Sequence, residues 1–272
     1  MNFIIVILII IILIIILICS KYSIDYFTSN KISSNNQKEI IKLKNNKIIL
    51  CLFGVIPRGI NKTWDSIKTN IIDVLEKKEF KIDIYVFNIN VENNEVDGVI
   101  LNQNDINIIL DKNYINYYEE KLQSEIDTIV KIKFNQNIFT QEDYTKNTII
   151  NAYRQLYAEY SVGQFLEKNK NKYDLTITCC SDLYFINKIN LKHIDNSLIK
   201  DNVYLSNINN SMGLTNGFYF GKIYKLLPIL NRYDTLKNKY HNYEQTLLEP
   251  VKENNIKYKF TDIIFFKIRA NN

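Results

Sequence analysis

The repeated alternation of short apolar runs with amphipathic helical segments constrains the fold of this chain more than any other feature. The runs "KIILCLFG" (47–54) and "KIDIYVFN" (81–88) have the length and composition of strands buried on both faces. Between them lie a loop containing Pro57 and Gly59 and then apolar residues at helical spacing from about 63 to 78. Strand, helix and strand in such close succession predict a βαβ unit with parallel strands and a right-handed connection.

The same alternation continues along the rest of the chain. A long helix over about 144–168, capped by Asp143 or Thr145, leads into "YDLTITCC" (173–180), which has the composition of a central strand. The less regular stretch 89–143 is expected to hold a short strand near 106–110 and a helix over about 114–130. The remaining expected elements are strands at 203–207, 217–221, 256–260 and 263–268 and helices at 222–233 and 240–254. This order predicts an α/β three-layer sandwich around a mostly parallel central sheet.

The first residues differ from the rest in composition. From Phe3 to Cys19 the chain is apolar and uncharged, and ~17 residues at ~1.5 Å each reach about 26 Å, close to the hydrocarbon thickness of a thin bilayer. A signal-anchor helix is therefore expected over 1–20, because the basic flank and small-x-small site of a cleaved signal peptide are missing. Residues 21–45 are polar and are expected to form a stalk, which leaves 46–272 as a soluble domain.

Composition argues against two kinds of protein. Lys and Arg (34) exceed Asp and Glu (29), for a net charge of +5, but the lysines are scattered singly and form no basic block. Nucleic acid is therefore not an expected partner. The four cysteines, at positions 19, 51, 179 and 180, have neither the spacing of a disulfide framework nor that of a CxxC metal site, and free buried thiols are expected.

Residues that suit phosphate or metal chemistry follow three of the expected strands. Ligands of open α/β sheets bind beyond the carboxyl ends of the strands, which singles out Arg58, Asn88 and the pair Ser181–Asp182. Arg58 either offers a guanidinium fork to a phosphate or is an ordinary loop residue. Asp182 either offers hard carboxylate oxygens to a Mg²⁺ or Mn²⁺ ion bound to a diphosphate, or caps the next element as a turn residue. The residues alone leave these alternatives open.

Five segments occur in the order "GVIPRGINKTWDSIKTNII", "KIDIYVFN", "YDLTITCCSDLYF", "NGFYFGK" and "YEQTLLEPVKENNIKYKF". This order resembles a family of GT-A-type glycosyltransferases common in bacteria and large DNA viruses, and the resemblance covers roughly 47–262. It implies a GT-A-like domain that takes a nucleotide-diphosphate sugar as donor, with Mn²⁺ or Mg²⁺ held by Asp182 at the end of the motif strand. It also matches Arg58, Asn88 and Glu244 to functional positions of the family.

The chain departs from the family pattern at two positions. Cys180 stands where the motif commonly has an arginine, so a charge facing the diphosphate is lost. Asn216 stands where relatives often have an aspartate, and a neutral amide cannot act as a general base. If transfer inverts the anomeric centre, Glu244 is then the candidate catalytic base, whereas a retaining enzyme would not need it. The alternative for Glu244 is an ordinary exposed helix carboxylate.

The sequence thus predicts a membrane-anchored, hexosyltransferase-like enzyme that acts on an unidentified glycan, protein or lipid acceptor. The alternative is a catalytically inactive carbohydrate-binding or structural virion protein of the same fold, which the two departures favour. The side of the membrane stays open. Lys21, Lys31 and Lys38 favour a cytosolic domain, whereas the sequons at 61–63 and 209–211 suit a lumenal domain in a Golgi-like endomembrane or a virion membrane.

Overall fold

The computed structural model describes residues 45–92, 95–96, 99–110, 114–134, 138–208, 213–236 and 239–268. The expected signal-anchor over 1–20, nearly all of the expected stalk over 21–45, and the sequon at 209–211 lie outside these ranges. Within them, no helix has both the length and the apolar composition needed to cross a bilayer. The fold described below is that of the expected soluble domain.

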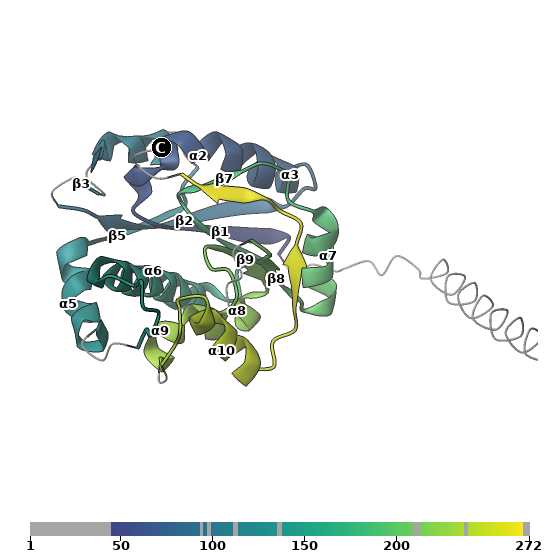
Figure 1. The fold of residues 1–272 in the computed structure, drawn as a ribbon. Helices are drawn as coiled ribbons and strands as arrows, with labels where there is room; N and C mark the ends of the chain where they lie inside the picture. The colour runs from purple at the N-terminus through teal and green to yellow at the C-terminus, as the bar shows by residue number, and fades with distance from the viewer. Residues whose placement is uncertain are drawn as a thin grey trace, which may run out of the picture. The chain divides into compact units, whose positions relative to one another are not determined.

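A seven-stranded sheet with the order β10-β8-β9-β6-β1-β2-β5 forms the centre of this domain (Figure 1). β1 (Lys47–Gly54) lies between β2 (Lys81–Asn90) and β6 (Leu175–Cys180) and is parallel to both. The other parallel pairs are β2 with β5 (Tyr117–Leu122) and β8 (Val203–Ser206) with β10 (Tyr258–Thr261), whereas β9 (Phe218–Gly221) is antiparallel to β6 and β8. The predicted α/β class and mostly parallel sheet are confirmed.

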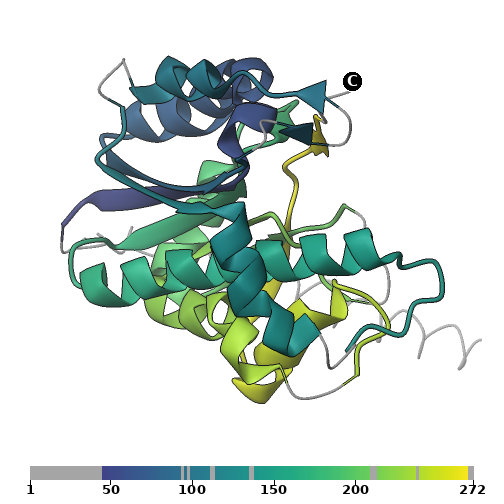
Figure 2. The same ribbon diagram turned by 90° about the vertical axis from the view of Figure 1, so that its left-hand side faces the viewer.

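Helices cover both faces of the sheet and complete three layers (Figures 1 and 2). One face carries α2 (Ile60–Ile67), a π-helical turn (Lys68–Ile72) and α3 (Asp73–Glu76). The other carries α6 (Lys146–Asn169), against which α5 (Gln123–Phe134), α8 (Ile223–Leu230) and α9 (Arg232–Thr235) pack. α10 (Gln245–Glu253) packs on α8, and α7 (Leu191–Lys200) lies beside β8 and β9. The predicted cap of α6 is confirmed at Thr145, whose Oγ1 accepts a hydrogen bond from Thr148 N at 3.1 Å.

Two expectations between residues 89 and 143 are wrong. The strand expected near 106–110 is instead a 3₁₀ turn (Gln103–Ile106) followed by α4 (Asn107–Leu110). The helix expected over 114–130 is divided between strand β5 and helix α5. β5 is an edge strand of sequence "YYEEKL" and is largely exposed, so it lacks the apolar run that identifies a buried strand.

Two short hairpins lie outside the main sheet. β3 (Glu95–Val96) pairs with β4 (Val99–Ile100). The strand expected at 263–268 is β11 (Phe265–Lys267), which pairs antiparallel with β7 (Leu183–Phe185) and not with the central sheet. β7 begins directly after Asp182, so this pairing brings the residues around Lys267 next to the end of β6.

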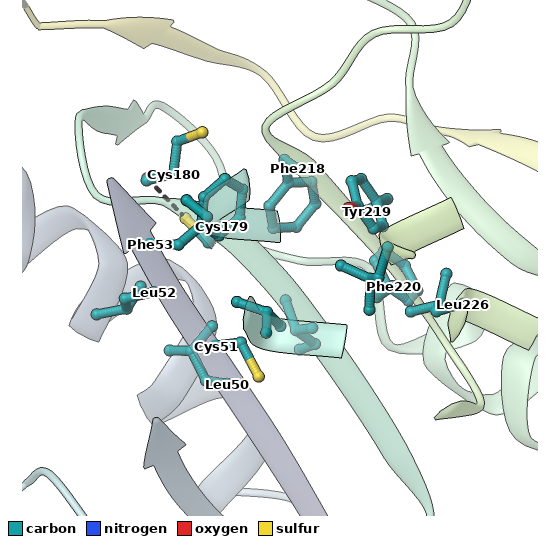
Figure 3. Close-up of a cluster of buried hydrophobic side chains, with 14 of the residues drawn as sticks. Leu50, Cys51, Leu52, Phe53, Cys179, Cys180, Phe218, Tyr219, Phe220 and Leu226 are labelled. Carbon is teal, nitrogen blue, oxygen red and sulfur yellow. Dashed lines mark hydrogen bonds between the residues drawn. The ribbon is translucent and has the colours of Figure 1, made fainter. Parts of the chain in front are cut away.

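The core is built around β1, whose residues from Ile48 to Phe53 are all buried. Figure 3 shows how side chains of β1, β6, β9 and α8 pack together there. Cys51, Cys179 and Cys180 are free and buried, as expected for these three positions. Burial raises the pKa of the Cys51 thiol to about 12 and also raises the pKa of Cys180. These thiols therefore stay protonated at neutral pH.

Candidate ligand-binding pocket

A pocket of about 480 Å³ opens at the carboxyl ends of the parallel strands β1 and β6. Phe53 pairs with Cys180 in the register of these strands, and Ser181 N donates a hydrogen bond to Phe53 O at 3.1 Å. The loops that follow the two strands therefore start at the same level of the sheet. Side chains from both loops, from the N-terminal half of α6 and from the segments before β9 and α10 line the pocket. Its volume is typical of small-molecule sites.

The loop after β1 turns sharply at Gly54, which has a φ of 116°. It continues into a 3₁₀ turn (Ile56–Arg58) that carries Arg58 to the pocket. A Cβ on Gly59 would lie 3.3 Å from Asp182 Cα, so the two strand-end loops approach closely. Thr63 of α2 holds the second loop by donating a hydrogen bond from Oγ1 to Ser181 O at 2.7 Å.

Replacing Gly54 with alanine is expected to lower the free energy of unfolding by about 1–3 kcal/mol, because side chains rarely adopt this φ. Crowding would not explain the loss, since the nearest atom to an added Cβ is Ser181 Oγ at 3.8 Å. Urea denaturation measures the effect. Lys168→Ala on the exposed face of α6 is the control and should change stability by less than about 0.5 kcal/mol. Equal stability of the two variants would contradict the strain at Gly54.

Arg58 and Asp182 form an ion pair across the two loops, although 124 positions separate them in the chain. The Asp182 side chain is 5% exposed and the Arg58 side chain 26% exposed. Arg58 donates from one terminal nitrogen to Asp182 Oδ2, while its Nε is buried without a partner among the described residues. The backbone oxygen of Asp182 accepts a hydrogen bond from Ile268 N at 2.8 Å, just beyond β11. Protein contacts thus hold the ion pair in place, and the Nε donor of Arg58 has no partner among the described residues.

The structure brings most of the predicted site residues to this one pocket. Arg58, Ser181, Asp182, Asn216 and Glu244 all line it. No hydrogen bond or ion pair joins the partly exposed carboxylate of Glu244 to the residues that the structure describes. Asp182 neither points into a filled interior nor lies on the opposite rim from Arg58, two arrangements that would have excluded a shared site.

Asn88 is the predicted site residue that does not reach the pocket. It is 2% exposed, and its Oδ1 accepts a hydrogen bond from Ile56 N at 3.1 Å. Its Nδ2 faces the Tyr118 hydroxyl at 3.3 Å and the Glu120 carboxylate at 3.4 Å. Both ends of the amide are therefore used to tie β2 and β5 to the loop that carries Arg58. Asn88 supports the pocket from behind this loop and does not line it.

A divalent cation would find one well-placed protein ligand here. No group of three His, Cys, Asp or Glu side chains converges within the described ranges. Asp182 already shares Oδ2 with Arg58, and the protonated Cys180 thiol is a poor ligand for a hard cation. Mg²⁺ and Mn²⁺ are often held by one or two carboxylates together with substrate phosphates and water. The residues present fit such a cation only as part of a metal–phosphate complex.

Sequence reasoning missed the polar face of α6 and the contribution of β11. Asn147, Asn151, Arg154 and Gln155 of α6 line the pocket, as does Lys267 of β11. The helical spacing of these α6 residues is visible in the sequence, but a polar helix face without a partner is indistinguishable from a solvated one. Arg154 is committed to Asp127 through two hydrogen bonds of 2.6 Å, whereas Lys267 is exposed at the pocket and has no partner among the described residues.

A buried polar network lies directly beneath the pocket. Glu159 of α6, which is fully buried, forms an ion pair with Arg232 of α9, with 2.7 Å between Oε2 and a guanidinium nitrogen. The hydroxyls of Tyr219 and Tyr243 donate to the same carboxylate at 2.5 and 2.9 Å. Burial, together with the charge of Glu159, raises the pKa of both tyrosines well above the usual value. Both phenols are therefore neutral donors, and Tyr243 also lines the pocket.

Three comparisons with known proteins were informative to different degrees, and a similarity was found with solved structures. No family model matches the sequence. No curated protein matches it either. Among solved structures, the chain is similar to the apo form of mouse xyloside xylosyltransferase 1, with a TM-score of 0.45 and 9% sequence identity, over 79% of this chain and 84% of that one.

Proposed function

We propose that this protein is a glycosyltransferase that binds a nucleotide-activated sugar with its diphosphate at Arg58 and Asp182. The observation that carries the proposal is the ion pair of these residues at the carboxyl ends of two parallel strands, inside a pocket of small-molecule size. This edge of an open α/β sheet is where nucleotide ligands bind. The guanidinium of Arg58 lines this pocket, and it is a charge-assisted donor of the kind that phosphate oxygens accept.

The chemical requirement of sugar transfer suits the charges of this pocket. When the bond between the sugar and the diphosphate breaks, negative charge develops on the departing phosphate oxygen. Arg58 lies in the pocket and Lys267 at its exposed side, so two cations are available to stabilise that charge. Mg²⁺ or Mn²⁺ bound at Asp182 would supply further charge neutralisation. The loss of the family arginine at Cys180 is then offset by cations from other elements.

Glu244 is the proposed general base if the transfer inverts the anomeric centre. It lines the pocket, and its carboxylate has no partner within the described residues, so it is available to accept a proton. In that reaction the acceptor oxygen bonds to the anomeric carbon, the bond to the diphosphate oxygen breaks, and the acceptor proton moves to Glu244. Asn216 cannot take this role, because a neutral amide does not accept a proton near neutral pH. In a retaining transfer, Glu244 would not act as the general base.

A second function, carbohydrate binding without catalysis, is favoured by two observations. Asp182 is already neutralised by Arg58, and no three-ligand metal cluster is found in the part of the chain that the structure describes. A pocket with these features could bind a carbohydrate without catalysing its transfer. An unidentified sugar acceptor belongs only to the proposed enzyme, whereas membrane attachment through residues 1–20 belongs to the proposal for either function.

Titration of the protein with nucleotide sugars tests the proposed enzyme. Calorimetry with UDP- and GDP-sugars is expected to give a Kd between about 1 μM and 1 mM for at least one of them, the usual range of KM values. Chelation of divalent cations is expected to weaken that binding by about tenfold, since the cation links Asp182 to the diphosphate. Release of the nucleoside diphosphate is then followed over time. Binding without release, together with retained binding of a free glycan, would favour the carbohydrate-binding module, and absence of nucleotide-sugar binding would refute the enzyme.

A further inference from the structure

Asn216 is a buried amide at the pocket with one polar group unused. It precedes β9, is 6% exposed, and lines the pocket. Its Oδ1 accepts a hydrogen bond from Gln155 Nε2 at 3.3 Å, whereas its Nδ2 has no partner among the described residues. A buried amide nitrogen without a partner is unfavourable, and it calls for an acceptor that is not part of the protein.

The orientation of the Asn216 amide follows from that of Gln155. Gln155 Nε2 lies 3.3 Å from Glu159 Oε1, and a carboxylate only accepts hydrogen bonds. Gln155 therefore turns its NH₂ group toward Glu159, and the same group lies 3.3 Å from Asn216 Oδ1 and 3.7 Å from Cys180 Sγ. If Gln155 were reversed, two oxygens would face each other. Asn216 consequently directs its oxygen to Gln155, and its NH₂ group is left without a protein partner in a residue that lines the pocket.

Glu159 cannot change its role to accommodate a reversed glutamine. Arg232 and the hydroxyl of Tyr219 donate to Oε2 at 2.7 and 2.5 Å, and the hydroxyl of Tyr243 donates to Oε1 at 2.9 Å. Together with Gln155, these donors occupy about four lone-pair sites, the full capacity of a carboxylate. Because the guanidinium always remains charged, Glu159 is held as an acceptor from three sides. The buried network thus determines which end of the Asn216 amide is left without a protein partner.

We propose that Asn216 donates a hydrogen bond from Nδ2 to a hydroxyl oxygen of the bound sugar, and that Gln155 is a positioning residue that keeps this donor in place. The inference rests on the proposed function and adds to it the contact that recognises the sugar. A neutral amide backed by a carboxylate suits an uncharged hydroxyl better than a phosphate anion. The diphosphate and the sugar are then recognised by different chemistry, Arg58 for the former and Asn216 for the latter.

Two variants separate sugar recognition from diphosphate binding. Asn216→Leu keeps about the size of the side chain and removes the donor without adding a charge. We expect it to weaken binding of UDP-glucose, or of GDP-mannose if the protein prefers guanosine, by about tenfold, and to leave binding of the free nucleoside diphosphate unchanged. Asn61→Leu makes the same chemical change at an exposed position of α2 and is the control. Unchanged sugar-nucleotide affinity, or an equal loss for both ligands, would overturn the sugar contact.

A measurement without ligand tests the positioning role. Gln155→Glu places a second carboxyl group beside Glu159, which raises the pKa of the pair in the folded state above the unfolded value. The variant should therefore be less stable than wild type at pH 8, and the difference in Tm should shrink as the pH falls toward 5. Gln141→Glu, away from the pocket, is the control. Equal stability of the two variants at pH 8 would overturn the contact between Gln155 and Glu159 on which the positioning role depends.

If the wild-type protein binds none of these nucleotides, the proposed function fails together with the sugar contact. If only the Asn216 variant gives the contrary result, the sugar contact fails and the proposed function stands.

Discussion

Replacement of Arg232 with methionine is expected to lower the free energy of unfolding by about 3–5 kcal/mol. Arg232 and Glu159 are 1% and 0% exposed, so the substitution leaves the carboxylate buried with neutral donors only. The hydroxyls of Tyr219 and Tyr243 and the amide of Gln155 would still contact Glu159, but none of them carries a compensating charge. Urea denaturation of the variant and the wild type measures the loss.

Two further variants make this result specific to the buried pair. Lys170→Met removes the partner of Glu167 from an ion pair whose side chains are 52% and 46% exposed, and it should cost less than about 1 kcal/mol. Arg232→Met combined with Glu159→Gln removes both charges and should recover part of the stability lost by the single change. A single Arg232 variant that is as stable as the Lys170 control would show that the pair does not stabilise this core.

Replacement of Arg58 with methionine is expected to weaken binding of a nucleoside diphosphate by about 10- to 100-fold, because charge-assisted hydrogen bonds of about 1.5–3 kcal/mol are lost. The nearly buried Asp182 carboxylate also loses its compensating charge and would then repel the ligand. Calorimetric titration with UDP or GDP measures the change. Lys68→Met, in the π-helical turn that follows α2, is the control. It removes one positive charge from the ion pair with Asp73 and should leave the affinity unchanged.

Asp182→Asn tests the other half of the pair. If Asp182 holds a cation on the diphosphate, the asparagine variant should bind UDP or GDP equally well with and without Mn²⁺, whereas the wild type should bind more tightly with the metal. A variant that keeps the full stimulation by Mn²⁺ would show that the cation binds elsewhere. Retention of wild-type affinity by Arg58→Met would remove the basis of the proposed diphosphate site.

The central part of the fold could be predicted from sequence because β1, β2 and β6 are buried on both faces over most of their length and are therefore mainly apolar. β5 could not, since an edge strand needs neither a continuous apolar run nor a strict alternation. The end of a strand is also easier to predict than the direction of the side chain that follows it. Arg58 and Asp182 could be expected at one edge, but only the coordinates reveal that Asn88 turns behind the loop.

The part of the site that sequence reasoning missed depends on long-range contacts. Gln155 acquires its orientation from Glu159, and Glu159 from Arg232, which is 73 positions further along the chain. A charged residue in the middle of a helix predicts solvent exposure, yet Glu159 is fully buried because its partners arrive from β9, α9 and the segment before α10. No local pattern contains this information.

The pairing of β11 with β7 has a consequence for biosynthesis. Ile268 N, just beyond β11, donates a hydrogen bond to the backbone oxygen of Asp182, and Lys267 at the end of β11 lines the pocket. Residues near position 268 therefore complete a loop that was translated much earlier. Chains on the ribosome fold progressively from the N-terminal side. A nascent chain can thus pair β1 with β2 and β6 long before its pocket is complete, and it gains the finished site only after β11 has emerged from the exit tunnel.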